Sequence, residues 1–242
     1  MANTKARRLN SSKLKLTLAA ASLVLASTSA NATVVTLSGS TVNFSFNSAF
    51  LLPIFGTYSV SGDTLSFSPI NFIASQQATG FDWASGTTPL ITITAKSGYW
   101  LTSVSNFEQG GYQRLEQSPN STVVGVSGLF SVNNTPVSIA PDAPLTTAIS
   151  AAALFSNPSL FQTTPWTSSQ SVGLAPFQTS ATAKVENLLL AGSMGAPFDK
   201  AFIEKKLISV SGFTTPVPVP SAIWLFGSAL TGIVIARRKK TA

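Results

Sequence analysis

The stretch Val42–Asn47 has the sequence VNFSFN, in which large apolar residues alternate with small polar ones. Successive side chains of a strand point to opposite faces, so this period of two predicts a strand with one buried and one solvated face. Val42, Phe44 and Phe46 would form the buried face. Similar alternation, interrupted by Gly, Pro and Ser, recurs through residues 33–214. We therefore expect an all-β domain over these residues.

The strands that this pattern predicts are short and closely spaced. A hairpin over 57–68 is expected to turn at Ser61-Gly62-Asp63, because Gly and Asp favour tight turns. The glycine-containing stretch 125–128 is expected to be the turn of a further strand pair. Eight to ten short strands of this kind favour an antiparallel β-sandwich that is jelly-roll-like. The other expected strands cover residues 71–76, 90–95, 99–106, 121–126, 129–132, 179–190 and 200–212.

Residues 132–179 differ from the rest of the domain. They hold six of the 14 prolines and are rich in Ser, Thr and Ala. The stretch 143–154 predicts one short helix, because Pro144 suits a first helical turn and no other proline follows within it. We expect the remainder to form a long excursion from the sheet, with a loosely packed loop as the alternative.

The first 32 residues consist of three parts in a fixed order. Basic residues come first, an apolar run covers 16–26, and Ala30-Asn31-Ala32 ends the segment. This order predicts a secretory signal peptide over residues 1–32. Cleavage by signal peptidase after Ala32, directed by the small residues Ala30 and Ala32, would make Thr33 the mature N-terminus. The basic residues are Lys5, Arg7, Arg8, Lys13 and Lys15.

Residues 215–242 also consist of three parts. Alternating prolines hold the chain extended, an uncharged run covers 221–236, and four basic residues follow. As a helix the uncharged run would be about 24 Å long, close to the roughly 30 Å of a hydrocarbon core. We predict a transmembrane helix over 221–236. A buried core helix is the weaker alternative, because such a helix needs no adjacent cations.

The two terminal segments predict the same topology. Both carry basic residues beside their apolar runs. By the positive-inside rule, both ends would lie in the cytoplasm and residues 33–214 would lie outside the inner membrane.

A proline motif, an apolar run and a basic cluster follow one another near the C-terminus: Val217, Pro218, Val219 and Pro220, then Trp224, Leu225, Phe226, Gly227 and Ser228, then Arg237, Arg238 and Lys239. In this order the residues closely resemble the PEP-CTERM sorting signal of Gram-negative bacteria, in its variant with V-P-x-P in place of P-E-P. The resemblance implies a protein that is exported, held transiently in the inner membrane and processed by an exosortase. This chain has no glutamate between the prolines, which bears on the exosortase subtype that would read it.

Two internal segments carry a weaker resemblance. Residues 91–99 (ITITAKSGY) and 183–188 (AKVENL) are similar to segments of secreted PEP-CTERM proteins. Those proteins are mostly β-sandwich exports, so the resemblance implies a fold and a destination but no activity.

Composition excludes several classes of function. The chain has no cysteine and no histidine, so disulfides, Ser-His-Asp and Cys-His catalytic groups and histidine-ligated zinc are impossible. The formal charge is +7, but nine of the 15 basic residues lie in the two terminal segments, and the other six face eight acidic residues. The domain is therefore net negative, which disfavours nucleic acid as a partner. We expect no cofactor and no bound metal.

Two sets of residues are candidates for contact with glycans. Glu108 and Glu116 flank an expected turn at Gly110-Gly111, and two carboxyl groups can cleave a glycosidic bond, although a solvated hairpin carries such residues too. Four aromatic residues could form a stacking platform for sugar rings, with Asp82 or Gln113 as hydrogen-bond partners. The alternative for these four is a place in the core or at its rim. They are Trp83, Trp100, Tyr112 and Trp166.

Two terminal signals around a charge-poor β-domain without histidine favour a non-enzymatic exported protein. Its expected destination is the cell surface or the extracellular exopolysaccharide matrix of a biofilm. A carbohydrate-binding module that recognises exopolysaccharide is the first alternative. A carboxylate-dependent enzyme acting on glycans is the second.

Overall fold

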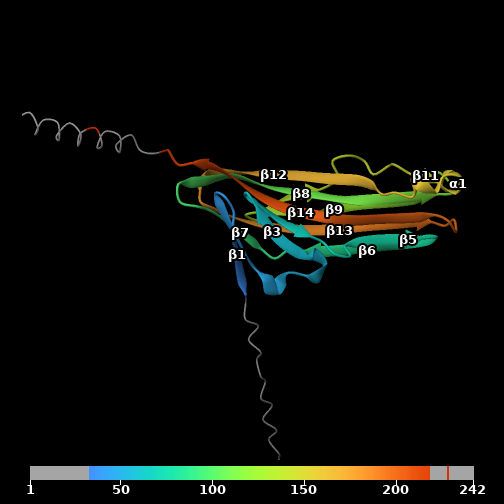
Figure 1. Cartoon of the computed structure of the whole chain (residues 1–242), viewed down its shortest axis with the longest axis horizontal. Coiled ribbons are helices and arrows are strands. Elements are labelled where there is room, and N and C mark those ends of the chain that lie inside the picture. The colour runs from blue at the N-terminus through green and yellow to red at the C-terminus, as the bar shows by residue number, and fades with distance from the viewer. Residues whose placement is uncertain (1–32, 219–227, 229–242) are drawn as a thin grey trace, which may run out of the picture. The chain divides into compact units, whose positions relative to one another are not determined.

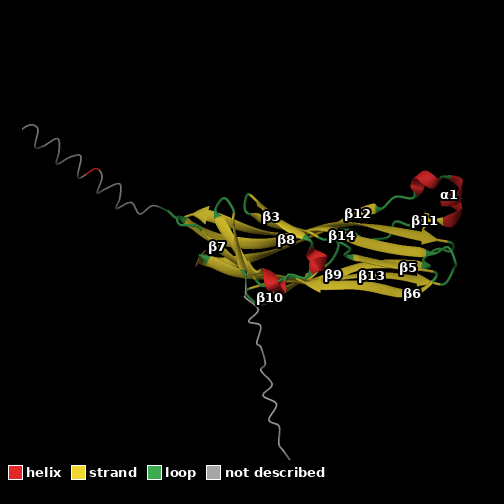
Figure 2. Cartoon of the chain, turned by 60° about the horizontal axis from the view of Figure 1, so that its bottom comes forward, coloured by secondary structure: helices red, strands yellow, loops and turns green. Residues whose placement is uncertain are grey.

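The computed structural model describes residues 33–218 and Ser228 (Figure 1). These residues form fourteen strands in two seven-stranded sheets (Figure 2), so the expectation of an all-β domain is confirmed. The predicted signal peptide 1–32 lies outside the described residues. So do the predicted transmembrane helix 221–236, apart from Ser228, and most of the sorting motif. In the part of the chain that is described, no helix is long and apolar enough to cross a membrane.

The first sheet, here called sheet A, is built around the long strand β13 (Ser180–Met194). One edge of β13 pairs with β9 over most of its length, while the other pairs first with β7 and then with β6. The remaining strands extend the sheet beyond β7 and β9. The other strands of sheet A are β1 (Val34–Ser38), β2 (Val42–Asn47), β6 (Thr79–Thr87), β7 (Ile91–Ala95), β9 (Thr122–Val132) and β10 (Thr135–Ile139).

The second sheet, sheet B, is built around β8 (Tyr99–Glu116) and β14 (Lys200–Pro216), which pair along nearly their whole lengths. The other edge of β14 pairs with β4 and β5, and the other edge of β8 pairs with β12. Among the strands described, every pairing is antiparallel except the short parallel pair of β11 and β8. The other strands of sheet B are β3 (Thr57–Ser61), β4 (Thr64–Ser68), β5 (Ile73–Gln77), β11 (Ile149–Ser150) and β12 (Thr164–Gln178).

The two sheets pack face to face around one core. Phe46 of sheet A lies edge-on against Tyr58 of sheet B, with ring centroids 5.2 Å apart, and also contacts Phe67. In β2, Val42, Phe44 and Phe46 are all buried, while the residues between them are half-buried. The alternation in VNFSFN therefore predicts both the bounds of this strand and its inward face.

Several other sequence predictions are confirmed. The hairpin expected over 57–68 is β3–β4, and Gly62 at its turn has a φ of 58°, which favours glycine. The strands expected over 71–76 and 90–95 are β5 and β7, with bounds shifted by one or two residues. Those expected over 179–190 and 200–212 are the first parts of the longer β13 and β14.

The turn expected at 125–128 is wrong. β9 runs unbroken through these residues and pairs with β13. At Gly128, a Cβ would lie 2.0 Å from the carbonyl oxygen of Glu186, so this glycine allows close approach of two backbones. A glycine in a strand and a glycine in a turn look alike in the sequence.

The long excursion expected over 132–179 is also largely wrong. β10 and the fifteen-residue β12 occupy much of it. Among the described strands, β12 pairs with β8 alone. It is therefore an edge strand, which tolerates Pro165 and Pro176. The helix expected over 143–154 is confirmed only in part: α1 (Ala151–Ser156) includes residues 151–154, whereas residues 143–148 are not helical and residues 149–150 form β11. The first turn of α1 is capped by the Ser150 hydroxyl. The short 3₁₀ helices are Ser48–Phe50, Pro53–Phe55 and Pro158–Leu160.

Candidate functional site

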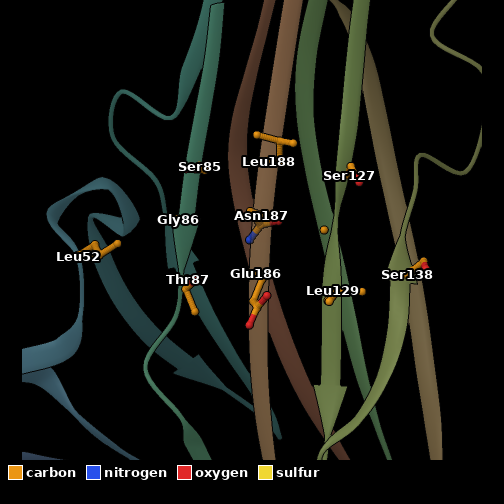
Figure 3. A pocket seen from close by; sticks show the side chains of 11 residues that line it. Leu52, Ser85, Gly86, Thr87, Ser127, Leu129, Ser138, Glu186, Asn187 and Leu188 are labelled. Atoms are coloured by element: carbon orange, nitrogen blue, oxygen red, sulfur yellow. The ribbon is translucent and has the colours of Figure 1, made fainter.

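A hollow on the described surface lies over the outward face of sheet A (Figure 3). Its volume is about 690 Å³, and β6, β13, β9 and β10 form its floor, with Leu52 at one side. Its polar residues are Glu186, Asn187, Thr87 and the three serines Ser85, Ser127 and Ser138. Leu129 and Leu188 supply apolar surface among them. A hollow with this mixture suits a ligand that carries both hydroxyl groups and apolar faces.

Glu186 is the one carboxylate that lines this hollow. Lys184, two residues earlier on β13, lies on the same outward face, and its Nζ is 2.6 Å from Glu186 Oε1. Both side chains are 38% exposed, so water screens the pair and it contributes little stability. The second carboxylate oxygen of Glu186 can accept hydrogen bonds from the hydroxyls of a ligand.

An exposed aromatic strip continues from the hollow along β6. Trp83 is 66% exposed and Phe81 is 58% exposed, and both lie on the same face of β6 as Ser85. Trp83 is paired with Leu190 and Phe81 with Gly192 of β13. Because residues on one face of a strand repeat every two positions, the Trp83 Cα is about 7 Å from that of Ser85. The indole is thus next to the hollow.

Gly192 allows the Phe81 ring to lie across β13. A Cβ at this position would be 2.5 Å from the ring and 2.9 Å from Val123 Cγ1. The ring therefore occupies the space that a side chain at residue 192 would fill, between β6 and β9. Phe81, Trp83 and the exposed Val123 and Leu188 form an apolar surface, which we call the outer strip.

The four aromatic residues predicted to form one platform are not brought together. Trp83 is on sheet A, whereas the other three are on sheet B. Trp100 packs edge-on against Phe177 with centroids 4.7 Å apart, beside a separate hollow of about 350 Å³. A single platform made of Trp83 and Trp100 is therefore wrong, because they belong to different layers of the fold.

Tyr112 and Trp166 are buried, with exposed fractions of 3% and 4%. The Tyr112 hydroxyl accepts a hydrogen bond from the Thr147 amide at 3.2 Å, and Trp166 Nε1 donates to the Glu204 carbonyl at 3.1 Å. These rings match the alternative of aromatic residues in the core and at its rim. Burial with a satisfied polar atom is the usual state of such a side chain.

The proposed hydrogen-bond partners of the platform are not part of the hollow over sheet A. One oxygen of Asp82 accepts a hydrogen bond from the Ser75 amide at 2.7 Å, and Gln113 is buried. Neither side chain lines the hollow over sheet A.

The turn expected at Gly110-Gly111 is wrong, and this separates Glu108 from Glu116. Both carboxylates lie on the continuous strand β8, where eight residues span roughly 26 Å. Glycosidases need their two carboxyl groups within about 10 Å of each other. The Glu116 carboxylate is held by Arg114 at 2.7 Å and by the Thr122 hydroxyl at 2.8 Å. This pair therefore cannot act together on one glycosidic bond.

A buried polar cluster was missed by the sequence analysis. It consists of Lys205 from β14, Glu108 and Asn106 from β8, and Asn187 from β13, all of which are buried. Burial lowers the pKa of Lys205, and attraction to Glu108 opposes this shift only in part. Alternation along β14 places Lys205 on the same face as the apolar residues Ala201 and Ile203, which could have indicated that Lys205 is buried. The three adjacent charged residues at 204–206 instead indicate a solvated segment.

The described residues contain no group of three or more acidic side chains that could hold a metal ion. In comparisons with known proteins, the sequence matches no family model, and no curated protein matches it.

Proposed function

We propose that the protein is a non-enzymatic export, sorted by an exosortase to the cell surface or to the extracellular polysaccharide matrix. The observation that carries the proposal is the ordered motif at 217–239, together with the leader at 1–32. The β-domain fits between them, because β1 begins at Val34 and β14 ends at Pro216. A jelly-roll-like arrangement of the two sheets belongs to the same proposal.

The ends of the domain suit processing at both signals. Cleavage after Ala32 would leave Thr33 as the first residue, and its carbonyl accepts hydrogen bonds from the Ser48 amide and hydroxyl, both at 3.1 Å. At the other end the Val217 amide donates to the Gly98 carbonyl at 2.8 Å, and Pro218 follows as an exposed residue. Removal of either terminal segment would leave these contacts in place.

The intact mass of the native protein, measured by fraction from its producing cells, tests this proposal. We expect a species that begins at Thr33 and ends near Pro218 in the surface or matrix fraction. A species that keeps Arg237–Ala242 and stays in the inner membrane would show instead that the tail is a permanent anchor. Recovery from the cytoplasm alone would contradict export.

A pair of variants sharpens the test of sorting. The double variant Pro218→Ala, Pro220→Ala changes the proline motif, and we expect the unprocessed form to accumulate in the inner membrane. Pro176→Ala is the matched control, because it replaces an exposed proline within β12. Normal processing of the double variant would mean that an exosortase does not read this motif.

The hollow and the outer strip support a second candidate function, recognition of exopolysaccharide. Trp83 and Phe81 offer exposed rings beside a hollow lined by one carboxylate and four hydroxyl-bearing residues. Sugars present apolar ring faces that stack on aromatic side chains, and their hydroxyls bond to carboxylates and serines. The site would therefore lie on sheet A alone and would use one of the four aromatic residues expected from the sequence.

Retention on gels that carry the polysaccharide of the producing cells tests this function. We expect Trp83→Ala and Glu186→Gln to weaken retention. Phe213→Ala is the matched control, because Phe213 is similarly exposed, at 51%, but lies on sheet B. Equal retention of all these variants and the unaltered protein would count against glycan binding and would leave the sorting proposal untouched.

A further inference from the structure

The buried cluster brings a lysine, an amide and a carboxylate into direct contact across the two sheets. Lys205 Nζ donates hydrogen bonds to Glu108 Oε2 and to the side-chain carbonyl oxygen of Asn187. Lys205 and Glu108 belong to adjacent strands of sheet B, while Asn187 belongs to β13 of sheet A. The side chains of Lys205 and Glu108 have no exposed surface.

The surroundings of this contact are largely apolar. The Lys205 ammonium lies 5.6 Å from the centre of the Phe72 ring and 5.5 Å from that of Trp166. Burial among such groups lowers the pKa of Lys205, which favours the neutral amine. A desolvated lysine amine is a nucleophile, whereas an ammonium group is not.

The amide nitrogen of Asn187 has an unusual status. Among the described residues, Asn187 Nδ2 is buried and has no hydrogen-bond partner. An unpaired buried donor is destabilising, and native structures contain few of them. Departure of this nitrogen from the cluster would remove the unpaired group.

We propose that Lys205 and Asn187 form an intramolecular amide bond, with Glu108 as the group that transfers protons. The Nζ–Cγ bond forms, the Cγ–Nδ2 bond breaks, and one ammonia molecule leaves. The reaction uses only groups that the cluster contains, and it needs no oxidant, reductant or metal.

The protons and electrons balance through Glu108. Its carboxylate first takes a proton from the Lys205 ammonium, and the freed electron pair of Nζ attacks Asn187 Cγ. Glu108 then gives a proton to the departing Nδ2 and takes a second one from Nζ. The products are the amide, ammonia and a neutral Glu108 carboxyl group, so no net charge is left in the core. Asn106 Nδ2, 3.3 Å from Glu108 Oε1 and 3.0 Å from Gln170 Oε1, holds the carboxyl group in position.

This bond would join the last two long strands of the fold. Residues 187 and 205 are 18 positions apart, on strands that belong to opposite sheets. A covalent link between them restricts the unfolded chain in the way that a disulfide does. The chain has no cysteine, so it cannot obtain such a link from disulfides. This inference is independent of the sorting proposal.

Peptide mass spectrometry of the full chain tests for the bond. Trypsin cuts after Lys184, Lys200 and Lys206, so Asn187 and Lys205 fall in the separate peptides 185–200 and 201–206. We expect these two peptides to be recovered joined, lighter than their sum by one ammonia molecule, with no cut after Lys205. Recovery of the separate peptides with Asn187 intact would overturn the proposal. Loss of ammonia within an unlinked 185–200 would also overturn it, because it would show only a cyclised asparagine.

Three variants assign the roles within the cluster. Lys205→Met and Glu108→Gln should each yield unlinked peptides. Lys206→Arg is the matched control: Lys206 is the neighbouring, exposed lysine, and the change keeps the trypsin site. A full yield of joined peptides from Glu108→Gln would overturn the role given to Glu108. If Lys205→Met or Glu108→Gln does not fold, the peptides of the unaltered chain still decide whether the bond exists.

Discussion

The carboxylate of Asp63 accepts two hydrogen bonds from Thr41, at 2.7 Å from its amide and at 2.6 Å from its hydroxyl. Asp63 lies in the β3–β4 turn, whereas Thr41 precedes β2, so the contact joins a hairpin of sheet B to one of sheet A. The Thr41 hydroxyl also lies 2.7 Å from that of Thr214 on β14. A residue that the sequence indicates as part of a local turn thus links three parts of the sandwich.

Replacement of Asp63 by alanine should destabilise the domain. The Thr41 amide would lose its acceptor in a partly buried place, so we expect the free energy of unfolding to fall by about 1–3 kcal/mol. Urea denaturation followed by fluorescence measures the change. Asp82→Ala is the control, because Asp82 accepts its hydrogen bond from the exposed Ser75 amide, which water can satisfy. Equal losses for the two variants would contradict this reading.

Acid should weaken the fold through Asp63 and Asp199. Burial raises the pKa of each carboxyl, but the hydrogen bonds that each accepts outweigh it, so both pKa values lie below the ordinary 3.8. The unfolded chain then binds more protons than the folded one as the pH falls through and below 3.8, and stability decreases there. Unfolding midpoints measured from pH 6 downward should show this decrease. In the double variant Asp63→Ala, Asp199→Ala, the unfolding midpoint should depend less steeply on pH. An unchanged pH dependence would be evidence against a role of these two carboxyl groups.

Gly110→Ala should be strongly destabilising. Its Cβ would lie 1.9 Å from the Glu204 carbonyl oxygen and 2.6 Å from Trp166 Nε1, and β8 and β14 would have to separate. Overpacking of this kind costs about 1–3 kcal/mol or more. Gly173→Ala is the matched control on β12, since no described heavy atom lies within 4 Å of the added Cβ. Thermal denaturation compares the two, and similar melting temperatures would show that the strands can adjust.

The two tryptophans Trp166 and Trp83 should differ sharply in what they contribute to stability. Trp166→Ala removes a buried ring and should lower the free energy of unfolding by about 3–5 kcal/mol. Trp83→Ala removes an exposed ring and should change it by about 0.5 kcal/mol or less. Chemical denaturation of both variants measures the difference. A large loss for Trp83→Ala would mean that its effect on glycan retention cannot be separated from unfolding.

Local alternation is sufficient to predict most strands but not their lengths. VNFSFN predicts β2 with its correct bounds, because every apolar residue of the stretch is buried and every polar residue is only half-buried. In β8 the pattern is lost after Asn106, where Glu108 and Gly110 replace large apolar residues. These inward positions are polar or small because they face Lys205, Trp166 and other specific partners. Such partners lie on distant parts of the chain, so the local sequence pattern cannot predict these contacts.

The amino-acid sequence by itself determined the β character of the domain and excluded every histidine- and cysteine-based chemistry, because both follow from composition and from the local period of two. It is also the sole basis for the expected processing at both ends. The tertiary structure alone decided that Trp83 is exposed beside a hollow while Trp166 is buried, and that Lys205, Glu108 and Asn187 meet. The physical reason is that contact across two sheets depends on strand pairing and register, which bring together residues that are far apart in the chain.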